Sequence, residues 1–365
     1  MREGWEYKKL GQVCTSDLGK TLNKSKDRGE LHPYLCSINI LWDKIDLSTL
    51  KQACFEADEQ EKYTVRKGDL LVCEGGDTGR SAIWDRDETI LYQNALHRLR
   101  FHEYVSPKFV LFYLMYLKDI GEIDNKYSKG VTIKHLVKKA LLSIPLPIPP
   151  KPTQLSIVTE LDKLNELIRI KKEQLKDYDT LAQSIFYEMF GDPVENEKGW
   201  EVKTFGDLFK LKSGDGLSSK DFNTGIYPVY GGNGISGYHN SFNMKGCYII
   251  IGRVGVYCGN VRKVDGEFWL TDNAFRLIYK ENEQNSFFIL YLLNILDLHQ
   301  YANAAAQPVI SNLTLKSINV PLPPLSLQQS FAHKIEQIER QKTEVQKTIT
   351  DLETLLASRM QYWFD

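Results

Sequence analysis

The chain has 365 residues, which is long enough for two domains that each bury a hydrophobic core. Its hydrophobic content of 42% and charged content of 25% are close to globular averages, which excludes a disordered chain and a membrane-embedded protein. The formal net charge of −1 gives no basic footprint for nucleic acid, so any DNA binding requires local basic patches and the field of partner subunits.

The N-terminal stretch and the cysteines predict a soluble, cytoplasmic protein. MREGWEYKKL is charged and lacks the apolar segment of a secretory signal, and the longest apolar run, at residues 109–117, is too short to cross a bilayer. The cysteines show no C-x-x-C spacing and no clustering with histidine, so we expect free thiols, no zinc site and no redox pair. They are Cys14, Cys36, Cys54, Cys73, Cys247 and Cys258.

The chain contains an internal repeat that covers almost its whole length. GWEYKKLGQVC at residues 4–14 returns as GWEVKTFGDLF at residues 199–209. Two apolar segments, residues 106–117 and 285–296, predict one buried helix in each copy. IPLPIPP near the end of the first copy matches VPLPPLS in the second. The protein is therefore predicted to consist of two copies of one unit.

Each copy is predicted to be a mostly-β domain followed by one long helix. Short runs rich in Val, Ile, Tyr and Phe, separated by Gly, Asn and Asp, indicate strands and turns. The fold class is therefore α+β, with two similar mostly-β domains joined by two long helices. The predicted boundaries are 1–150 for the first domain, 151–191 for the first helix, 192–324 for the second domain and 325–365 for the second helix.

The long helices carry apolar residues at steps of three and four, which is the heptad pattern of a coiled coil. Because a folded domain separates the helices, they can pair antiparallel with a pseudo-twofold axis. About 38 residues of helix span ~57 Å, more than docking two domains requires, which suggests a spacer. Ser326 and Gln329 predict a capping box at the start of the second helix. The predicted seam is formed by Leu161, Leu164, Ile168, Leu175, Tyr178, Ile185, Ile335, Ile338, Val345, Ile349, Leu352 and Leu356.

Three motifs resemble catalytic or cofactor sites. The G-x-G-x-x-G at residues 232–237 is followed by turn and strand residues, whereas a dinucleotide site requires a helix there. EGGDTGRS at residues 74–81 is interpreted as a tight turn that brings Arg80 forward, toward a phosphate or a base. The E-x-K triplet that begins at Glu201 resembles a nuclease motif, but it belongs to the repeated opening of each copy. No N-P-P-Y type motif for aminomethyl transfer is present.

The remaining candidates are basic, polar and aromatic loops that differ between the two copies. Lys and Arg suit phosphates and guanine edges, while Asn and Gln suit adenine edges. The candidate DNA-binding residues of the first copy are Lys20, Lys24, Lys26, Arg28, Arg80, Lys129 and Lys134. Those of the second copy are Lys220, Asn233, Tyr238, His239, Arg253, Asn303 and Gln307. The competing interpretation is that these side chains are solvent-exposed and bind nothing.

Four stretches resemble recurrent motifs of the specificity subunits of type I restriction-modification systems: GDLLVCEGGDTGRSAIW, YPVYGGNGISGYHN, IIIGRVGVYCGNV and VPLPPLSLQQ. The resemblance implies two target-recognition domains that each read one half of an asymmetric bipartite site in double-stranded DNA, with the helices setting the spacer. It also implies that two methyltransferase subunits, which carry S-adenosylmethionine, dock on the helices, and that restriction subunits can join. This chain would then be non-catalytic and hold no cofactor. The first copy lacks the P-P-L-x-x-Q-Q pattern of the second, so the start of its helix is left open.

Three other interpretations stay open. One is the recognition subunit of a related two-component restriction enzyme, in which one partner both cuts and methylates. The second is an enzyme, a nuclease that uses Glu201 or a nucleotide-dependent transferase that uses the loop at Gly232. The third is a structural adaptor without sequence preference. The DNA sequence itself depends on loop geometry at the scale of single hydrogen bonds and cannot be derived from these motifs.

Overall fold

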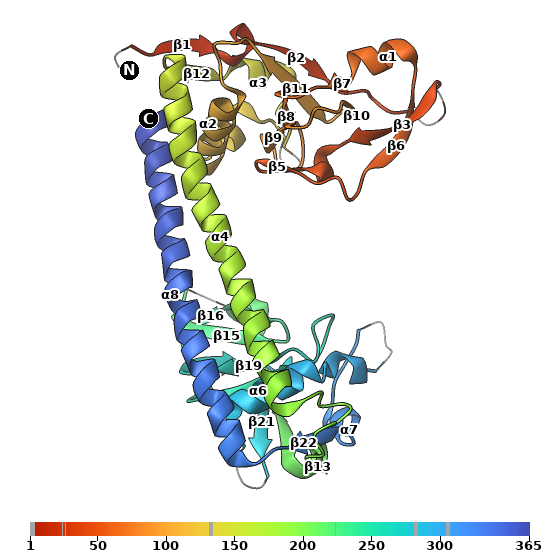
Figure 1. Ribbon diagram of the computed structural model, residues 1–365, viewed down its shortest axis with the longest axis vertical. Helices are drawn as coiled ribbons and strands as arrows, with labels where there is room; N and C mark the ends of the chain where they lie inside the picture. Colours follow the sequence, from red (N-terminus) through yellow and green to blue (C-terminus); the bar gives the residue numbers. More distant parts are fainter. Residues whose placement is uncertain are drawn as a thin grey trace. The chain divides into compact units, whose positions relative to one another are not determined.

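The protein is described from a computed structural model, in which contacts divide the chain into two units. Unit 1 comprises Met1–Lys171 and Thr348–Asp365, and unit 2 comprises Lys172–Lys347. The two long helices, α4 (Lys151–Phe190) and α8 (Leu325–Phe364), each contribute one part to either unit (Figure 1). The predicted domain boundaries stay a prediction. The structure describes residues 4–23, 25, 27–130, 134–222, 224–280, 284–303 and 307–365.

The described part of unit 1 contains two four-stranded sheets. The first has the order β2-β11-β8-β9 and is antiparallel, with β2 Cys14–Leu18, β11 Leu96–Phe101, β8 Leu70–Cys73 and β9 Ser81–Ile83. The second has the order β6-β3-β10-β7, with β6 Lys51–Phe55, β3 Glu30–Leu35, β10 Ile90–Tyr92 and β7 Thr64–Val65. In this sheet β3 and β10 are parallel. Smaller elements are β1 (Glu6–Lys9), β12 (Pro145–Ile148), β4 (Ile40–Leu41), β5 (Lys44–Ile45), α1 (Ala57–Lys62) and α3 (Lys138–Ser143).

Unit 2 repeats the strand order of both four-stranded sheets. Its first sheet has the order β14-β21-β18-β19, with β14 Phe209–Ser213, β21 Ala274–Tyr279, β18 Tyr248–Gly252 and β19 Val261–Val264. Its second has the order β16-β15-β20-β17, with β16 Gly234–His239, β15 Tyr227–Gly231, β20 Glu267–Leu270 and β17 Met244–Lys245. β15 and β20 are parallel, as are β3 and β10. β13 (Glu201–Thr204) pairs with β22 (Asn319–Leu322) as β1 pairs with β12. The predicted internal repeat is therefore confirmed.

Each unit buries one short helix beneath its first sheet. α2 (Pro107–Asp119) carries Phe109 to Leu114 without a break in burial, and α6 (Ser286–Ile295) is its counterpart in unit 2. The side chains of Ser106 and Asn285 cap the two helices by accepting hydrogen bonds from backbone N–H groups of the first turn. Both helices are predicted by the apolar runs of the sequence, and both are confirmed. α5 (Phe205–Leu208) and α7 (Asn312–Leu315) complete the helices of unit 2 in the described residues.

A buried glutamine joins the start of one long helix to the first turn of the buried helix in each unit. In unit 1, Gln154 is 1% exposed; its Oε1 accepts a hydrogen bond from the Ser106 N–H at 2.8 Å, and its Nε2 donates to the carbonyls of Tyr104 and Pro149. In unit 2, the fully buried Gln328 accepts from the Asn285 N–H at 3.0 Å. It donates to the Gln284 side chain and to the Pro323 carbonyl. The two glutamines are equivalent in the repeat.

A phenylalanine joins the end of the other long helix to the same buried helix. Phe364 of α8 packs edge-on against Phe109 of α2 with ring centroids 5.4 Å apart, and Phe190 of α4 packs in the same way against Phe288 of α6 at 4.9 Å. The repeated tryptophan of the opening motif lies beside this contact. Trp200 donates from its indole N–H to the Phe190 carbonyl at 2.8 Å and so caps the end of α4.

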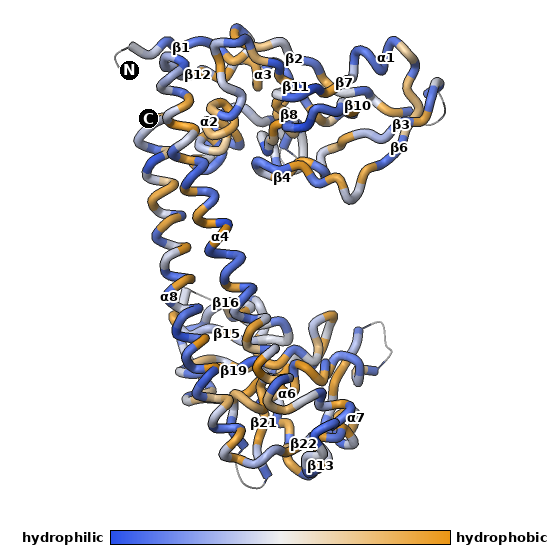
Figure 2. The backbone as a smooth tube through the Cα atoms, viewed as in Figure 1, coloured by the Kyte–Doolittle hydropathy of each residue, from blue (hydrophilic) through white to orange (hydrophobic). Residues whose placement is uncertain are grey.

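The long helices pack antiparallel within each unit. In unit 1, the carboxylate of Glu160 on α4 binds both Arg359 and the indole of Trp363 on α8. In unit 2, Lys342 of α8 binds Asp179 of α4 at 2.8 Å. Hydrophobic positions recur along both helices between hydrophilic ones (Figure 2). Six of the predicted seam residues are buried: Leu161, Ile168, Ile335, Ile338, Val345 and Ile349. The other six are half-buried: Leu164, Leu175, Tyr178, Ile185, Leu352 and Leu356.

The structure corrects one detail of the helix boundaries and supplies another. α8 begins at Leu325, so Ser326 lies inside the helix and the predicted capping box is wrong; the carbonyl of Pro324 accepts the first hydrogen bonds, from Leu327 and Gln328. α4 begins at the equivalent place, after Pro150. The first copy lacks the full P-P-L-x-x-Q-Q pattern, but it keeps the two prolines and the one glutamine that is buried.

Replacing Gln154 by alanine is expected to lower the free energy of unfolding of unit 1 by about 2–4 kcal/mol. The change removes three hydrogen bonds and leaves the Ser106 N–H and the Pro149 carbonyl buried without a partner. Gln328→Ala should destabilise unit 2 similarly. Hydrogen exchange of α2 and α6 reports the two units separately. The control is Gln329→Ala, an exposed neighbour that should change stability by less than about 0.5 kcal/mol. Unchanged exchange of α2 in Gln154→Ala would contradict the role of the buried amide.

Candidate nucleic-acid interface

In unit 1, two loops that are far apart in sequence form one cluster, which we call loop cluster 1. It consists of residues 74–80, which follow β8, and of residues 123–136, of which 131–133 lie outside the description. The Leu136 N–H donates to the Glu74 carbonyl at 2.7 Å, and Gly75 forms a β-bridge with His135. The Thr78 hydroxyl donates to Asp124 at 2.8 Å. Because these contacts join residues that are far apart in the sequence, the two loops can meet only when the sheet and α2 have folded together.

Buried polar groups support loop cluster 1 from below. His97 on β11 is fully buried, and its Nε2–H donates to the Leu136 carbonyl at 2.9 Å. Burial lowers the pKa of His97 and so favours the neutral imidazole, whose Nε2–H tautomer can donate this hydrogen bond. Lys118 of α2 binds Asp77 at 2.8 Å and Asp124 at 3.0 Å, and so links the two loops.

The equivalent strand of unit 2 is followed by loop cluster 2, which consists of residues 231–234, 253–257 and 303–309; residues 304–306 lie outside the description. The Gly255 N–H donates to the Pro308 carbonyl at 3.0 Å, and Val254 forms a β-bridge with Val309. The turn at Gly232 packs so closely that a Cβ there would lie 2.8 Å from the Val254 carbonyl oxygen. Glycine is therefore required at this position to bring the turn against the second loop.

Loop cluster 2 brings four predicted residues together. Asn233, Asn303 and Gln307 are exposed, and Arg253 is half-buried. Arg253 donates to the Asp272 carbonyl at 3.3 Å and lies over the Phe275 ring, so its guanidinium is held against the sheet. Asn303 accepts a hydrogen bond from the Val309 N–H at 2.8 Å and so shapes its own loop. Asn233 and Gln307 are the other exposed amides in the described part of the cluster.

The predicted lysines of unit 1 have different environments. Lys129 is exposed in loop cluster 1, and Lys134 donates to the Asp124 carbonyl at 3.0 Å. Lys20 is 4% exposed and binds Glu59 at 2.6 Å and Asp27 at 3.3 Å, so its charge is already neutralised inside the protein. Lys24 and Lys26 lie outside the described residues. Arg28 is exposed in the same loop.

Arg80 does not extend forward as the turn suggested. The tight turn is present, with positive φ angles at Gly76 and Gly79, but the guanidinium points inward and donates to the Ser37 carbonyl at 2.9 Å. The physical reason is that residues 36–50 pack against this side of the sheet and provide an acceptor. Arg80 thus joins two parts of unit 1.

Three predicted residues of unit 2 lie apart from loop cluster 2. Lys220 is exposed in a short 3-10 helix, η4 (Ser219–Asp221). Tyr238 is 48% exposed on β16, and His239 follows it with its ring edge-on to Trp269 at 5.1 Å. Tyr238 and His239 thus lie on a strand of the other sheet of the unit, and Lys220 precedes β15 of that same sheet.

Two residues of loop cluster 2 were not singled out from the sequence. Val256 is 77% exposed and Tyr257 is 54% exposed at the tip of a loop that is held by backbone hydrogen bonds on both sides. Apolar side chains on a fixed, exposed turn are available for contact with a binding partner. The sequence signal for them was the stretch IGRVGVY, in which the glycines at 252 and 255 mark a turn. Two large side chains follow the second glycine, at positions where a turn usually has polar residues.

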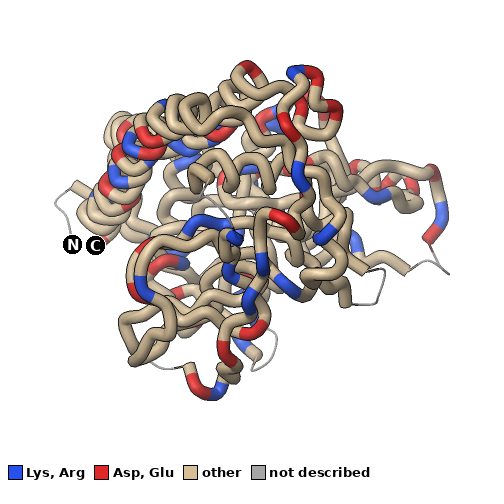
Figure 3. The backbone as a smooth tube through the Cα atoms, turned by 90° about the horizontal axis from the view of Figure 1, so that it is seen from below, with Lys and Arg blue, Asp and Glu red and all other residues tan. Residues whose placement is uncertain are grey.

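The charges of the protein are mixed. Acidic and basic positions are interspersed along the backbone rather than gathered by sign (Figure 3). In the described residues no group of three or more His, Cys, Asp or Glu side chains is placed to hold a metal ion. Glu201, considered as a nuclease carboxylate, is exposed at the start of β13 opposite Leu322. The six cysteines are free thiols. No described helix is both long and apolar enough to cross a membrane.

Comparison with known proteins identifies the family. The family model for the type I restriction modification DNA specificity domain matches residues 2–177 and 197–354. The chain is 28% identical over 225 residues to the specificity subunit of the type I restriction enzyme EcoprrI of Escherichia coli, in an alignment that covers 58% of this chain and 56% of that protein. It thus spans little more than half the length of this relative. Over 406 residues it is 21% identical to the MjaVIII specificity subunit of Methanocaldococcus jannaschii, covering 97% of this chain and 92% of the relative.

Solved structures agree on the fold. The S subunit of a type I restriction-modification system from M. genitalium superposes with a TM-score of 0.58 at 18% identity, covering 99% of this chain and 96% of that one. A chain from a structure of the type I R-M system gives a TM-score of 0.62 at 16% identity, covering 100% and 98%. The predicted fold class is confirmed. Since the same family model matches both copies of the repeat, the chain belongs to the type I restriction-modification DNA specificity family.

Proposed function

We propose that this chain is the DNA-recognition subunit of a type I restriction-modification complex, in which each unit reads one half of an asymmetric bipartite site. The observation that carries the proposal is the pair of loop clusters. Both follow the same strand of the same sheet, β8 in unit 1 and β18 in unit 2, yet their side chains differ. A repeated scaffold with different loops can hold two different sets of side chains in equivalent positions, and each set can contact a different half-site.

The two clusters suit different contacts with DNA. Lys129 of loop cluster 1 and Arg28, in the loop between β2 and β3, are exposed cations of the kind that bind phosphates. Asn233 and Gln307 of loop cluster 2 are exposed amides, which match the edge of adenine in the major groove. Val256 and Tyr257 add an apolar tip that suits the methyl group of thymine.

The partners in this proposal are two methyltransferase subunits that dock on α4 and α8 and carry S-adenosylmethionine, with restriction subunits joining the complex in the cytoplasm. Exposed apolar residues on the long helices support docking. Leu167 and Ile170 on α4 are 45% and 44% exposed, and Leu355 on α8 is 46% exposed. Apolar surface of this kind on an otherwise hydrophilic helix favours burial against a partner helix.

The direct test is methylation mapping of cells that express the chain with the methyltransferase encoded beside it. We expect methylation at one bipartite motif, which disappears when this chain is omitted. The purified chain alone, incubated with DNA and Mg²⁺ or with labelled S-adenosylmethionine, should show no turnover. Cleavage by the chain alone, abolished by Glu201→Gln, would instead support the nuclease interpretation.

Lys129→Ala is expected to weaken DNA binding of the complex about equally for all sequences. Each neutralised phosphate contributes to the salt dependence, so the slope of log affinity against log salt should become shallower by about 1. Fluorescence anisotropy over a salt series measures this slope. The matched control is Lys67→Ala, because Lys67 is exposed just before β8, at the end opposite loop cluster 1. Lys24→Ala with Lys26→Ala, outside the described residues, is predicted to act like Lys129→Ala. An unchanged slope removes these lysines from the interface.

Gln307→Ala is expected to relax specificity at one or two positions of a single half-site. Loss of a paired amide contact with a base lowers discrimination by about 1–3 kcal/mol. Methylation mapping of the variant complex shows which positions become degenerate. Lys129→Ala is the control for the other unit, because it should leave the motif unchanged. Degeneracy in both half-sites of the Gln307 variant would contradict independent reading by the two units.

A matched insertion in both long helices is expected to lengthen the spacer of the recognised site. The unit boundary crosses α4 after Lys171 and α8 after Lys347. Duplicating residues 165–171 and 341–347 at these points adds one heptad to each helix and keeps the seam in register. Seven residues add about 10 Å, which corresponds to about 3 bp at 3.4 Å per base pair. Methylation mapping should recover the original half-sites with the longer spacer.

Insertion into α4 alone is the control, since it puts the two helices out of register and should abolish assembly with the methyltransferase. An active double-insertion complex that still prefers the original spacer would show that the helices connect the domains without measuring the distance between half-sites.

A further inference from the structure

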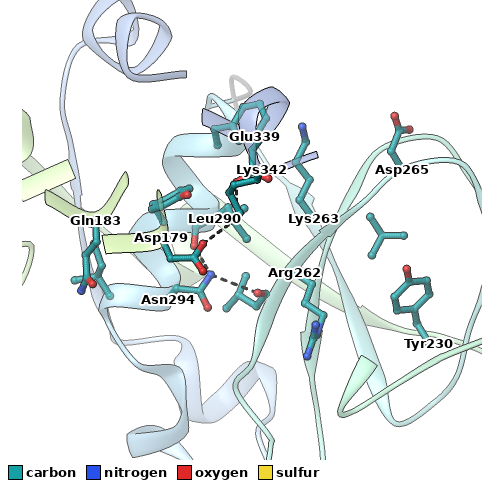
Figure 4. A pocket seen from close by; sticks show the side chains of 15 residues that line it. Asp179, Gln183, Tyr230, Arg262, Lys263, Asp265, Leu290, Asn294, Glu339 and Lys342 are labelled. Carbon is teal, nitrogen blue, oxygen red and sulfur yellow. Dashed lines mark hydrogen bonds and ion pairs between the residues drawn. The ribbon is translucent and has the colours of Figure 1, made fainter. Parts of the chain in front are cut away.

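Unit 2 contains an open groove of about 930 Å³ between β19 and α6. β19 forms one wall and is the last strand of its sheet in the described part of the unit. The half-buried side chains of Phe287, Leu290 and Tyr291 on α6 form the other wall. The parts of α4 and α8 that belong to unit 2 also line the groove, through Asp179, Gln183, Glu339 and Lys342 (Figure 4).

The groove presents cations that are not neutralised. Lys342 is bound by Asp179 at 2.8 Å and by Glu339 at 3.1 Å. By contrast, no ion pair of Arg262 or Lys263 on β19 occurs within the described residues. The Lys263 ammonium lies 3.7 Å from the centre of the Phe287 ring, and Arg262 donates to the Asn233 carbonyl at 3.3 Å. The two side chains extend from β19 in different directions (Figure 4).

In unit 1 the equivalent strand edge is covered by the chain itself. Residues 36–50 connect β3 to β6 and form the β4–β5 hairpin, which contacts β9. At its turn, the Asp43 N–H donates to the Ser81 carbonyl of β9 at 3.0 Å, and the Asp43 carboxylate binds Lys108 of α2 at 2.6 Å. In unit 2, Gly232 and Asn233 alone connect β15 to β16. The repeat thus has a hairpin in one copy and an open groove in the other.

The positions that bind the hairpin also have counterparts in the groove. Ile83 pairs with Leu70 in β8, and its counterpart Lys263 pairs with Ile249 in β18. Lys108 is the second residue after the cap of α2, and its counterpart after the cap of α6 is Phe287. In unit 1 the helix supplies the cation and the strand the apolar side chain. In unit 2 the strand supplies the cation, Lys263, and the helix supplies the apolar side chain, Phe287. A segment with a carboxylate beside apolar side chains would therefore meet one cation and one apolar group in either unit.

We propose that this groove binds an extended segment of the methyltransferase subunit that carries a carboxylate and apolar side chains, in the place that the β4–β5 hairpin occupies in unit 1. The partner in this inference rests on the proposed function. An uncovered edge strand accepts another strand through main-chain hydrogen bonds, and side-chain pockets select its sequence. Asp179, Glu339 and Asp265 in the lining disfavour a phosphate backbone as the occupant. A protein segment with one acid between apolar residues fits both the charge and the aromatic wall.

The test uses the complex of the full chain with its methyltransferase. Hydrogen exchange of residues 261–264 and 287–295 should slow when the complex forms without DNA, whereas residues 81–83 of β9, already covered, should be unchanged. A zero-length carbodiimide cross-linker should join Lys263 to an Asp or Glu of the methyltransferase. Mass spectrometry identifies that acidic segment, and Lys263→Arg should remove the cross-link while assembly persists.

Charge reversal provides the second measurement. Arg262→Glu with Lys263→Glu should lower the affinity for the methyltransferase at least about tenfold. The matched control is Lys210→Glu with Lys212→Glu, which makes the same charge change on exposed residues of β14, the opposite edge strand of the same sheet. Circular dichroism of both variants checks that they fold. Equal affinities of the two double variants would overturn the inference.

The outcomes separate the inference from the proposed function. A wild-type complex that methylates a bipartite site, but shows neither protection of β19 nor a Lys263 cross-link, overturns the groove and leaves the function intact. Protection of β19 that occurs only after DNA is added also overturns the groove as a protein-binding site. A complex that assembles with a protected groove but methylates no specific site contradicts the proposed function and supports the groove.

Discussion

In each unit the amide of one buried glutamine joins a long helix to the first turn of the buried helix, and the rest of the unit depends on this contact. Gln154 and Gln328 hydrogen-bond to backbone groups at the start of the buried helix, and Phe364 and Phe190 pack against the same helix. Leaving such groups unpaired in a buried site costs more than the hydrogen bonds themselves contribute. The angle at which each β domain meets its helix segments is therefore fixed by directional bonds as well as by apolar packing.

A rigid junction has a consequence for recognition. If the helices are held firmly against the sheets, the loops after β8 and β18 keep a defined position relative to the helix segments of their own unit. Buried polar contacts extend this order into the loops, through His97 in loop cluster 1 and through the close approach of Gly232 in loop cluster 2. Exposed side chains of the loops can then differ between the units while the sheets and helices beneath them stay the same. This separation of scaffold from loop surface suits the proposed function, in which each unit reads its own half-site.

The two units also differ beneath the loops, at the edge strands β9 and β19. The β4–β5 hairpin covers the first, while the second borders the open groove. An uncovered edge strand exposes main-chain groups that favour pairing. The two copies keep the same strand order but differ in how the edge strands β9 and β19 are covered. The protein thus combines a repeated core with a surface that differs between its two units. Such asymmetry is expected of a subunit proposed to meet two identical partners and a DNA site without symmetry.

The sequence by itself determined the repeat, the two buried helices, the heptad seam and the turn nature of the 232–237 motif, because each depends on local periodicity and composition. It did not determine which loops meet. Arg253 and Gln307 come together through the Val254–Val309 bridge and the Gly255 hydrogen bond, and Asn233 joins them through the close approach of Gly232 to Val254. Arg80 turns inward because a distant segment supplies the Ser37 carbonyl. Lys20 looked like a surface cation, yet Glu59 on α1 and Asp27 neutralise it in a buried site. Such outcomes depend on contacts between residues remote in sequence, which local patterns do not encode, and so only the tertiary structure decided them.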